Sequence, residues 1–334
     1  MCRPSVVNRA GPSGSAVSVP AVSRLRPFRF GLSLAGFDHG HDWPETARKV
    51  EALGYSTLLV PDHLGDQLAP LPALTAAAAA TTTLRVGTYV LDNDFRHPVL
   101  VAKEAATLDV LSGGRLELGI GAGWRKEEYD RAGIVFEPGP VRVDRLEEAI
   151  AVLKGLWSGR SFSHTGAHYR VAEMEGRPLP AQPDGPPLFL GGGGPRLLAL
   201  AGRHADIVGL APRARSDGVL EPTDISPEAT DAKVAALRGS AGERFADLEV
   251  NILTLVVEVT TSQARRDERV EELAQRWGMS PAAVSASPHV VVGSVDQVAD
   301  DLCAHRQRFG ISYVTVPEPA LASFAPVVAR LAGR

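Results

Sequence analysis

Cysteine is scarce in this sequence: Cys2 and Cys303 are the two cysteines among 334 residues. So few cysteines exclude a disulfide-bonded scaffold and a cysteine-rich metal site. None of the nine histidines begins a His-Glu-x-x-His motif, so we predict no bound metal. The sequence also contains neither the Gly-x-Ser-x-Gly motif of a serine nucleophile nor the Gly-Lys-Ser/Thr motif of a phosphate-binding loop.

The chain also lacks an excess of basic charge and a long apolar run. It carries 35 Lys and Arg against 39 Asp and Glu, a formal net charge of −4. No basic field is therefore available to attract nucleic acid or anionic lipid. No apolar run approaches the roughly 18 residues that a membrane span needs. We predict a cytoplasmic protein with no nucleic-acid partner and no membrane partner.

The first 26 residues differ from the rest in composition. Residues 1–26 contain four arginines and no acidic residue, and their apolar side chains are scattered among Pro, Gly and Ser. The segment has no continuous apolar stretch of the kind found in a secretory signal. We expect a disordered tail at 1–26, followed by one domain over 27–334.

Strand and helix patterns alternate along that domain. Short apolar strands without polar alternation are typical of a parallel sheet that is covered on both faces. Eight strand–helix units in about 300 residues favour a (β/α)8 TIM barrel. A doubly wound sheet is the competitor, but Trp124 occupies the place of the last glycine in the dinucleotide-binding pattern that begins at Gly119. The predicted strands span 28–34, 57–60, 84–91, 116–120, 188–190, 207–210, 250–259 and 313–316.

Capping signals mark the ends of two of the helices. Asp42 and Glu45 have capping-box spacing before one helix, and Ser294 and Gln297 have it before another. Gly310 is placed to end the second of these helices.

Two stretches are too long and too rich in polar residues, Gly and Pro for ordinary connections. They are residues 158–187, after the fourth predicted strand, and residues 211–226. We expect both to be irregular insertions. Loops of this length inside a barrel are often lids or binding segments, but a passive surface excursion fits the sequence equally well.

In this fold, active sites form at the carboxyl ends of the strands. Asp62 and His63 follow the second predicted strand. His63 is the candidate acid–base residue, because imidazole changes charge near neutral pH. The position suits a hydrogen-bonded rim histidine equally well, and Asp62 need not face its neighbour. His39 and His41 lie in a polar loop and are weaker candidates.

A run of four glycines follows the fifth predicted strand, before a helix that begins near Pro195. Backbone N–H groups at such a position can bind an anion, and glycine lets a flat ring approach the backbone. A tight turn with positive φ is the alternative, but one glycine would satisfy it. We therefore favour a ligand at Gly191, Gly192, Gly193 and Gly194.

A second glycine-rich segment, residues 119–123, follows the fourth strand and predicts a flat backbone wall. Trp124 could cap a pocket there or serve in packing. Glycine-rich strand ends with one histidine and no nucleophile predict chemistry supplied by a phosphorylated cofactor.

Residues 28–334 resemble the bacterial luciferase-like flavin and deazaflavin oxidoreductases. The pattern is similar to the actinobacterial branch that is predicted to use coenzyme F420. The resemblance is carried by Val60-Pro61-Asp62-His63, VGTYVLDNDFRHPVLVAKEAATLDVLSGGRLELGIGAGW from Val86, FLGGGGPRLLALAGRHADIVGL from Phe189, and GSVDQVADDLCAHRQRFGISYVTV from Gly293.

The resemblance implies a (β/α)8 barrel with an insertion, often a homodimer, that binds the cofactor ring at the carboxyl-end mouth. It also implies a bulge at Tyr89-Val90, often with a cis peptide, that supports one face of the ring. The four-glycine run would hold the phosphate region. The residues that the resemblance places around the cofactor are Asp62, His63, Tyr89, Val90, Ala122, Gly123, Trp124, Gly191, Gly192, Gly193 and Gly194.

The resemblance also bears on the reaction. In related sugar-phosphate dehydrogenases a His after the second strand is the base and a Glu after the fourth is the acid. His63 matches the base, whereas Trp124 stands in place of the acid, which argues against sugar-phosphate activity.

We predict an F420-dependent oxidoreductase in which a hydride moves between the cofactor and a small organic substrate. The reacting group would be C=C, C=N, C=O or an alcohol, and His63 would supply or remove the proton. One alternative is an FMN-dependent monooxygenase that uses O2, and another is a non-catalytic flavin- or F420-binding protein.

Overall fold

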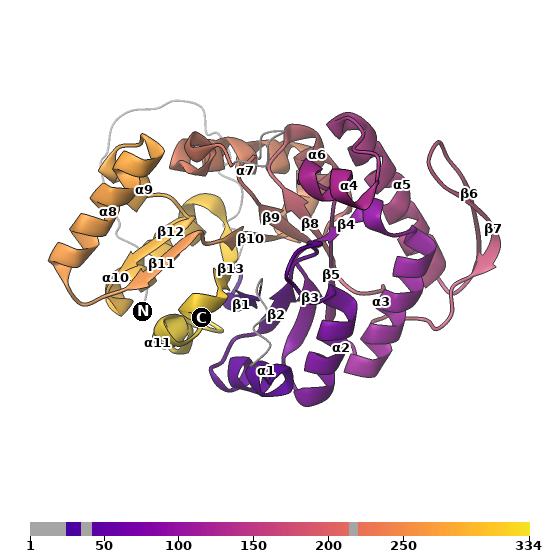
Figure 1. The fold of residues 1–334 in the computed structure, drawn as a ribbon, viewed down its shortest axis with the longest axis horizontal. Coiled ribbons are helices and arrows are strands. Elements are labelled where there is room, and N and C mark those ends of the chain that lie inside the picture. The colour runs from indigo at the N-terminus through magenta and orange to yellow at the C-terminus, as the bar shows by residue number, and fades with distance from the viewer. Residues whose placement is uncertain (1–24, 35–41, 214–219) are drawn as a thin grey trace, which may run out of the picture.

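The computed structural model describes residues 25–34, 42–213 and 220–334. Its centre is a closed barrel of eight parallel strands, which confirms the expected (β/α)8 architecture (Figure 1). The β3–β5 pairing completes the ring. In barrel order the strands are β1 (Arg29–Ser33), β2 (Thr57–Val60), β3 (Arg85–Thr88), β5 (Leu116–Gly121), β8 (Leu188–Gly192), β9 (Ile207–Leu210), β10 (Glu249–Leu253) and β13 (Ile311–Pro317).

Helices surround the barrel, so its strands are largely buried on both faces. Side chains from strands on different sides of the ring meet inside it: Leu59, Phe189 and Tyr313 belong to one buried cluster. The larger core lies between the strands and the surrounding helices. These helices are α1 (Trp43–Ala52), α2 (Pro70–Ala80), α3 (Pro98–Ser112), α5 (Gly139–Trp157), α6 (Pro195–His204), α7 (Pro227–Ala241), α10 (Val295–Phe309) and α11 (Leu321–Leu331).

The expected capping signals are confirmed. The Asp42 side chain accepts a hydrogen bond from the backbone N–H of Glu45, and α1 begins at Trp43. Ser294 and Gln297 form a complete capping box at α10. Gly310 ends that helix in the left-handed conformation. Local sequence therefore determines these helix ends.

A charged network fills the amino-terminal end of the barrel. The Arg29 guanidinium lies 3.6 Å from the centre of the Tyr313 ring and pairs with Glu117 at 2.6 Å and with Glu249 at 2.6 Å. Arg85 also reaches Glu117 at 2.6 Å. Because this end is closed by ion pairs, the opposite end of the barrel is the one left for a ligand.

The third predicted strand, 84–91, is interrupted in the structure. The chain forms β3, then a cis peptide bond between Tyr89 and Val90, then the two-residue strand β4 (Leu91–Asp92) and a short helix η1 (Asn93–Phe95). The cis bond that the family resemblance implied is thus confirmed. β4 pairs with β5 beyond the bulge, so the bulge redirects the chain without opening the wall.

The single strand expected over 250–259 is wrong. The chain leaves the barrel after β10, where Thr254 donates backbone and side-chain hydrogen bonds to the Thr315 carbonyl. It then forms β11 (Val256–Val259), which pairs in parallel with β12 (Val290–Gly293) outside the barrel. With α8 (Gln263–Trp277) and α9 (Pro281–Ser285), these strands enclose a small second core that the sequence analysis missed.

The insertion expected after the fourth barrel strand is present, but it is not irregular. Residues 158–187 contain an antiparallel hairpin of β6 (Ser161–Thr165) and β7 (Arg170–Glu175), which projects from one side of the molecule (Figure 1). Its strands carry mostly polar, exposed residues, because only part of the hairpin packs on protein. Exposure of this kind removes the hydrophobic pattern from which a strand is predicted.

The second long stretch, 211–226, is described in part. Residues 214–219 lie outside the described residues, and the short helix η2 (Pro222–Ile225) follows them. The predicted tail is likewise outside up to residue 24, as are His39 and His41. The remaining short helices are α4 (Lys126–Ala132), η3 (Gly242–Ala246) and η4 (Glu318–Ala320).

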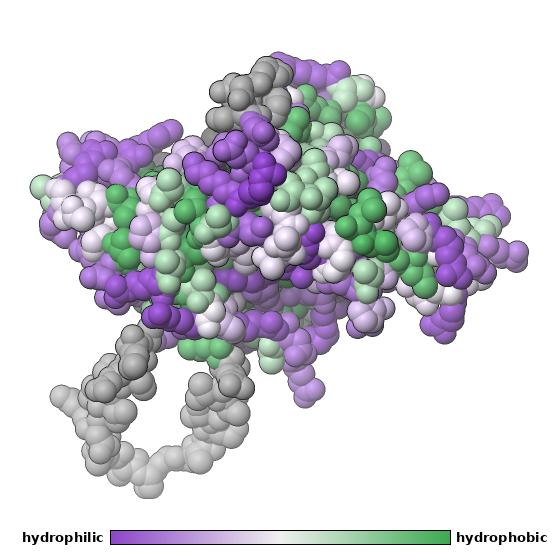
Figure 2. All heavy atoms as spheres, turned by 90° about the horizontal axis from the view of Figure 1, so that it is seen from below, coloured by the Kyte–Doolittle hydropathy of each residue, from purple (hydrophilic) through white to green (hydrophobic). Residues whose placement is uncertain are grey.

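Seen from below the view of Figure 1, hydrophilic and hydrophobic residues are interspersed over the face (Figure 2). Within 25–34, 42–213 and 220–334, no helix combines the length and apolar character needed to cross a membrane.

Candidate active site

The structure brings most of the predicted site residues to one half of the barrel rim. Asp62 and His63 follow β2, Ala122 and Gly123 follow β5, and the four-glycine run ends β8. These parallel strands lie together in the barrel, so their carboxyl ends meet on one side. The residues after the strands are largely half-buried, whereas the preceding strand residues are buried. The rim is therefore accessible above a closed wall.

His63 is oriented by a residue that the sequence analysis did not select. Its Nδ1 lies 3.0 Å from Oε2 of Glu128, in the first turn of α4. A carboxylate only accepts hydrogen bonds, so the Nδ1–H donates and Nε2 is the acceptor nitrogen of the neutral ring. The Trp124 ring packs edge-on against the imidazole, with 5.7 Å between centroids.

The described hydrogen bonds of the Asp62 carboxylate go to residues other than His63, and they link two loops of the rim. The carboxylate accepts hydrogen bonds from Arg96 at 2.5 and 2.9 Å and from the backbone N–H of Asp92 at 3.0 Å. The Asp62 side chain is 2% exposed. The structure thus gives Asp62 a supporting position, and its proposed contact with the cofactor stays a prediction.

Gly123 must be glycine because of its neighbours. Its φ is +74°, and a Cβ would lie 1.9 Å from the Tyr129 hydroxyl and 2.5 Å from Asp92. That hydroxyl donates to Asp92 at 2.7 Å. Burial raises the pKa of Asp92 to about 6 and also raises the pKa of Tyr129.

Arg142 of α5 holds the wall after β5 in place. Its guanidinium donates to the carbonyl of Ala122 at 2.7 Å and also to the carbonyl of Gly123. The same group lies 4.0 Å from the centre of the Phe136 ring. The carbonyls of this segment are therefore held by a buried cation, which the sequence alone did not indicate.

Val90 occupies space that the sequence analysis assigned to a ligand. Added Cβ atoms would lie 2.9 Å from its side chain at Gly121 and 3.2 Å from it at Gly191. At Gly119 an added Cβ would lie 2.9 Å from Val90 but only 1.9 Å from the Thr88 carbonyl oxygen. The expected flat wall is therefore covered in part by an isopropyl group from the bulge. Glycine is required at these positions for packing inside the barrel.

The four-glycine run has two different roles. None of its members has a positive φ, so the turn explanation is wrong. A Cβ at Gly192 would lie 2.0 Å from Leu197, and one at Gly193 would lie 2.1 Å from the Ala211 carbonyl oxygen. Gly194 has no atom within 4 Å of its would-be Cβ, and it is the N-cap of α6, which has no side-chain cap.

Hydrogen bonds connect Tyr89 to strands β10 and β13 across the barrel. Its hydroxyl donates to Asn251 of β10 at 2.9 Å, and the Asn251 amide donates to Thr315 at 2.8 Å. Its ring packs edge-on against Phe189. Burial raises the pKa of Tyr89, so the phenol is neutral and fixed at neutral pH. Sequence analysis missed Asn251, which lies within a predicted strand.

A buried ion pair anchors the chain that follows β9. Lys233 contacts Asp224 at 2.6 Å, and Asp224 accepts a hydrogen bond from the backbone N–H of Arg213 at 2.6 Å. Burial lowers the pKa of Lys233 despite this partner. Arg213 is thereby held beside the four-glycine run, since its backbone nitrogen lies 3.4 Å from a would-be Cβ at Gly193.

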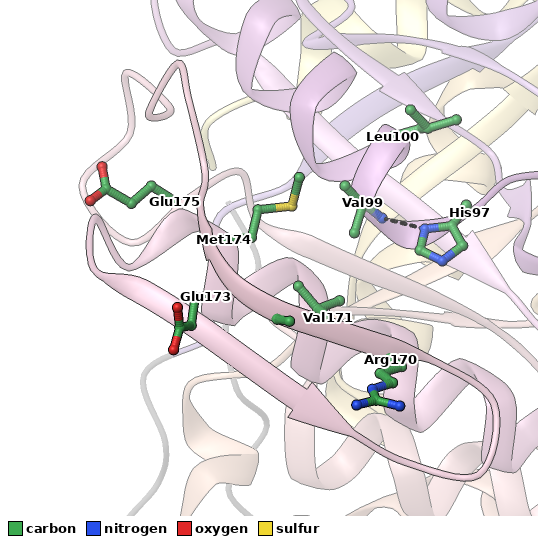
Figure 3. Close-up of a pocket in the computed structure, with 9 residues that line it drawn as sticks. His97, Val99, Leu100, Arg170, Val171, Glu173, Met174 and Glu175 are labelled. Atoms are coloured by element: carbon green, nitrogen blue, oxygen red, sulfur yellow. Dashed lines mark hydrogen bonds between the residues drawn. The ribbon is translucent and has the colours of Figure 1, made fainter.

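A hollow of about 740 Å³ lies elsewhere, between the beginning of α3 and the hairpin strand β7 (Figure 3). His97, Val99 and Met174 contribute to its walls. None of the residues that were predicted to bind the cofactor lines it. In the described part of the chain, no group of three His, Cys, Asp or Glu side chains is arranged to hold a metal.

Comparisons with known proteins agree with this architecture. The F420-dependent hydroxymycolic acid dehydrogenase of Mycobacterium tuberculosis is 30% identical over 281 residues, which cover 76% of this chain and 75% of that protein. An F420-dependent glucose-6-phosphate dehydrogenase of Beutenbergia cavernae is 32% identical over 259 residues, covering 75% and 71%.

Similarity of fold extends to more distant proteins. The F420-dependent tetrahydromethanopterin reductase of Methanopyrus kandleri has a TM-score of 0.70 at 19% identity, and the match covers 92% of this chain and 98% of that one. The family model for luciferase-like monooxygenases matches residues 25–313. This chain therefore belongs to the luciferase-like monooxygenase family of TIM-barrel enzymes.

Proposed function

We propose that this protein transfers a hydride between coenzyme F420 and a small organic substrate, with His63 moving the accompanying proton. The observation that carries the proposal is His63 itself, held by Glu128 at the carboxyl end of the barrel with Nε2 as its acceptor nitrogen. The relatives at 30% and 32% identity are named F420-dependent dehydrogenases, which supports the choice of cofactor.

The residues at the rim fit such a cofactor. Tyr89, Val90, Ala122 and Gly123 are half-buried and would hold the ring. The uncapped N-terminus of α6, with open space at Gly194, would hold the phosphate region through backbone N–H groups and the helix dipole. When bound, the deazaflavin supplies or accepts a hydride at the ring carbon that replaces flavin N5, and it reacts poorly with oxygen.

In the oxidising direction, Nε2 of His63 would accept the hydroxyl proton of an alcohol while the carbon that bears this hydroxyl gives its hydride to the bound F420, which leaves a carbonyl product. In the reducing direction, the protonated imidazole of His63 gives that proton to the carbonyl oxygen of the substrate. The Glu128 carboxylate stabilises the imidazolium that forms in between. Trp124 limits rotation of the ring and adds an apolar surface beside it.

We propose an alcohol–carbonyl pair, or a reducible C=C or C=N group, as the substrate. Trp124 takes the place of the acid expected in sugar-phosphate dehydrogenases, so a sugar phosphate is disfavoured. Its ring is partly exposed at 36%, and Arg125 lies over it at 4.7 Å. A substrate with an apolar portion beside its hydroxyl or carbonyl group suits this neighbourhood.

The test is titration of the purified protein with F420 and, separately, with FMN, followed by difference spectra and oxygen uptake. We expect F420 to bind and to change redox state with a panel of alcohols and ketones, without oxygen consumption. His63→Ala should lower turnover about 100-fold or more and leave the F420 Kd within a few-fold. Unchanged turnover would remove His63 from the reaction.

The second candidate is a monooxygenase that uses reduced FMN and O2, which the description of the matching family model favours. Oxygen uptake with FMN, together with no binding of F420, would support it. Binding of either cofactor without turnover would favour a non-catalytic role. The proposals of a homodimer and of a cytoplasmic location rest on the resemblance and the composition, and light scattering of the purified protein tests the former.

A further inference from the structure

We infer that Glu128 is the positioning residue for His63, and that it fixes the imidazole in the Nδ1–H form so that Nε2 faces the reacting group. This inference rests on the proposed proton-transfer role of His63. It assigns to α4 a task that neither the strand-end pattern nor the family resemblance had indicated.

The geometry of the pair supports the assignment. The Nδ1–Oε2 distance is 3.0 Å, and the two side chains are 18% and 12% exposed. The second carboxylate oxygen of Glu128 accepts a hydrogen bond from Arg125 at 3.0 Å. The carboxylate also lies in the first turn of α4, where the helix dipole favours a negative charge. Glu128 is thus held between Arg125 and His63, with one oxygen directed at the imidazole.

Helix α4 is itself firmly anchored, although it is only seven residues long. Tyr129, the next residue, is fully buried and donates to Asp92 at 2.7 Å. Its ring packs edge-on against Phe136, 4.8 Å between centroids. Because the buried Tyr129 side chain holds the helix through these contacts, its neighbour Glu128 has little freedom to move away from His63. The hydrogen bond from Tyr129 to Asp92 places α4 beside the end of β4 (Figure 1).

Asp62 cannot perform this task. Its carboxylate is occupied by Arg96 and by the backbone N–H of Asp92. The edge-on Trp124 ring closes another side of the imidazole. Among the described contacts of His63, Glu128 is therefore the group that selects its tautomer, as the carboxylate does in other carboxylate–histidine pairs.

The test compares Glu128→Ala and Glu128→Gln with Glu127→Ala. Glu127 lies on the same helix turn but is exposed and pairs with Arg131 at the surface, so it is a matched control. Nitrogen-15 NMR of the cofactor-free protein reports the tautomer, and the His63→Ala spectrum identifies the His63 signals. We expect the Nδ1–H form in the wild type and in Glu127→Ala. Glu128→Ala should shift the signals toward the Nε2–H form.

Turnover with F420 gives the second readout. Glu128→Ala should lower kcat at least about tenfold, with the F420 Kd changed no more than a few-fold. Glu128→Gln keeps the shape and one acceptor oxygen, so it should retain the Nδ1–H form and recover part of kcat. Glu127→Ala should match the wild type in both measurements.

Two outcomes separate the inference from the proposed function. A wild-type tautomer in Glu128→Ala would overturn the positioning role, whatever the turnover. A shifted tautomer with full turnover in both Glu128→Ala and His63→Ala would leave the positioning role intact and overturn the proposed function of His63.

Discussion

Val90 illustrates how one side chain determines where glycine is required. The backbone at Gly121 and Gly191 passes close to its isopropyl group, whereas at Gly119 the nearest atom to an added Cβ is the Thr88 carbonyl oxygen, at 1.9 Å, with Val90 at 2.9 Å. From the sequence, a glycine at a strand end indicates only that something lies against the backbone. Glycine is equally compatible with a cofactor ring or a protein methyl group against the backbone. The sequence therefore could not distinguish ligand binding from packing at these three positions.

This packing predicts a coupled pair of substitutions. Gly121→Ala places a Cβ 2.9 Å from Val90, so it should lower the free energy of unfolding by about 2 kcal/mol, because the closed barrel interior has little room to adjust. Val90→Ala removes the clashing methyl groups and should restore part of that loss. Urea unfolding of the two single variants and the double variant measures the coupling.

Gly139→Ala is the control, since its would-be Cβ meets no atom within 4 Å. Strict additivity of Gly121→Ala and Val90→Ala would show that Val90 is not what makes glycine necessary at 121.

The pairing of His63 with Glu128 shows a similar limit at the residue scale. Sequence analysis selected His63 because it follows a barrel strand, and the structure places it at the rim. It could not select Glu128, which lies 65 residues away on a seven-residue helix that no periodic pattern predicted. Asp62 is adjacent to His63 in sequence, but the sequence analysis did not require the two side chains to face each other, and in the structure the Asp62 carboxylate pairs with Arg96.

At the scale of elements, the beginning of α6 is the clearest candidate for holding the cofactor phosphate. Gly194 is its N-cap, with φ −77° and ψ 145°, which alanine adopts without strain. Gly194→Ala should therefore fold normally but intrude on the space above the helix. We expect it to weaken F420 binding about tenfold, as measured by spectroscopic titration.

Gly239→Ala, which also meets no atom within 4 Å, is the matched control and should bind F420 as the wild type does. Gly193→Val is a poorer test, because its side chain would collide with the Ala211 carbonyl and move the chain after β9. Equal F420 affinity in Gly194→Ala and Gly239→Ala would place the phosphate away from α6.

Strands were predictable where turn residues bound a fully apolar run. β2 and β9 have the bounds that the sequence predicted, 57–60 and 207–210. The sequence analysis predicted one strand over 250–259 instead of β10 and β11, because a continuous apolar pattern does not indicate where the chain passes from one sheet to another. The hairpin β6–β7 escaped prediction for the opposite reason, since its exposed strands have no apolar face to recognise.

At the scale of the whole molecule, the two ends of the barrel differ in the residues that they carry. Ion pairs among Arg29, Glu117 and Glu249 close the amino-terminal end, whereas the carboxyl end carries His63 and the uncapped helix α6. Repetition of one strand–helix unit made the barrel predictable. The second core around β11 and β12 is a single addition without repetition, so composition and periodicity gave no sign of it.

His289 joins these two parts and makes the stability of the molecule dependent on pH. It is 1% exposed, its Nδ1–H donates to the Leu253 carbonyl at 2.8 Å, and its own carbonyl accepts from Leu255. Burial lowers the pKa of His289 to about 4, from 6.5. Between these values the unfolded chain binds the proton and the folded chain does not, so the free energy of unfolding falls as the pH falls.

His289 should thus account for about 3 kcal/mol of stability that is complete above about pH 6.5 and lost by about pH 4. His289→Gln removes this titration. The fall in the free energy of unfolding between about pH 6.5 and about pH 4, measured by urea unfolding, should therefore be smaller by about 3 kcal/mol in the variant, even where the variant is less stable at neutral pH. The raised pKa of Asp92 acts in the opposite direction but is common to both proteins, so it cancels in the comparison. An unchanged slope would mean that the junction between β10 and β12 opens to solvent before the barrel unfolds, because an accessible imidazole would take up its proton without a cost to folding.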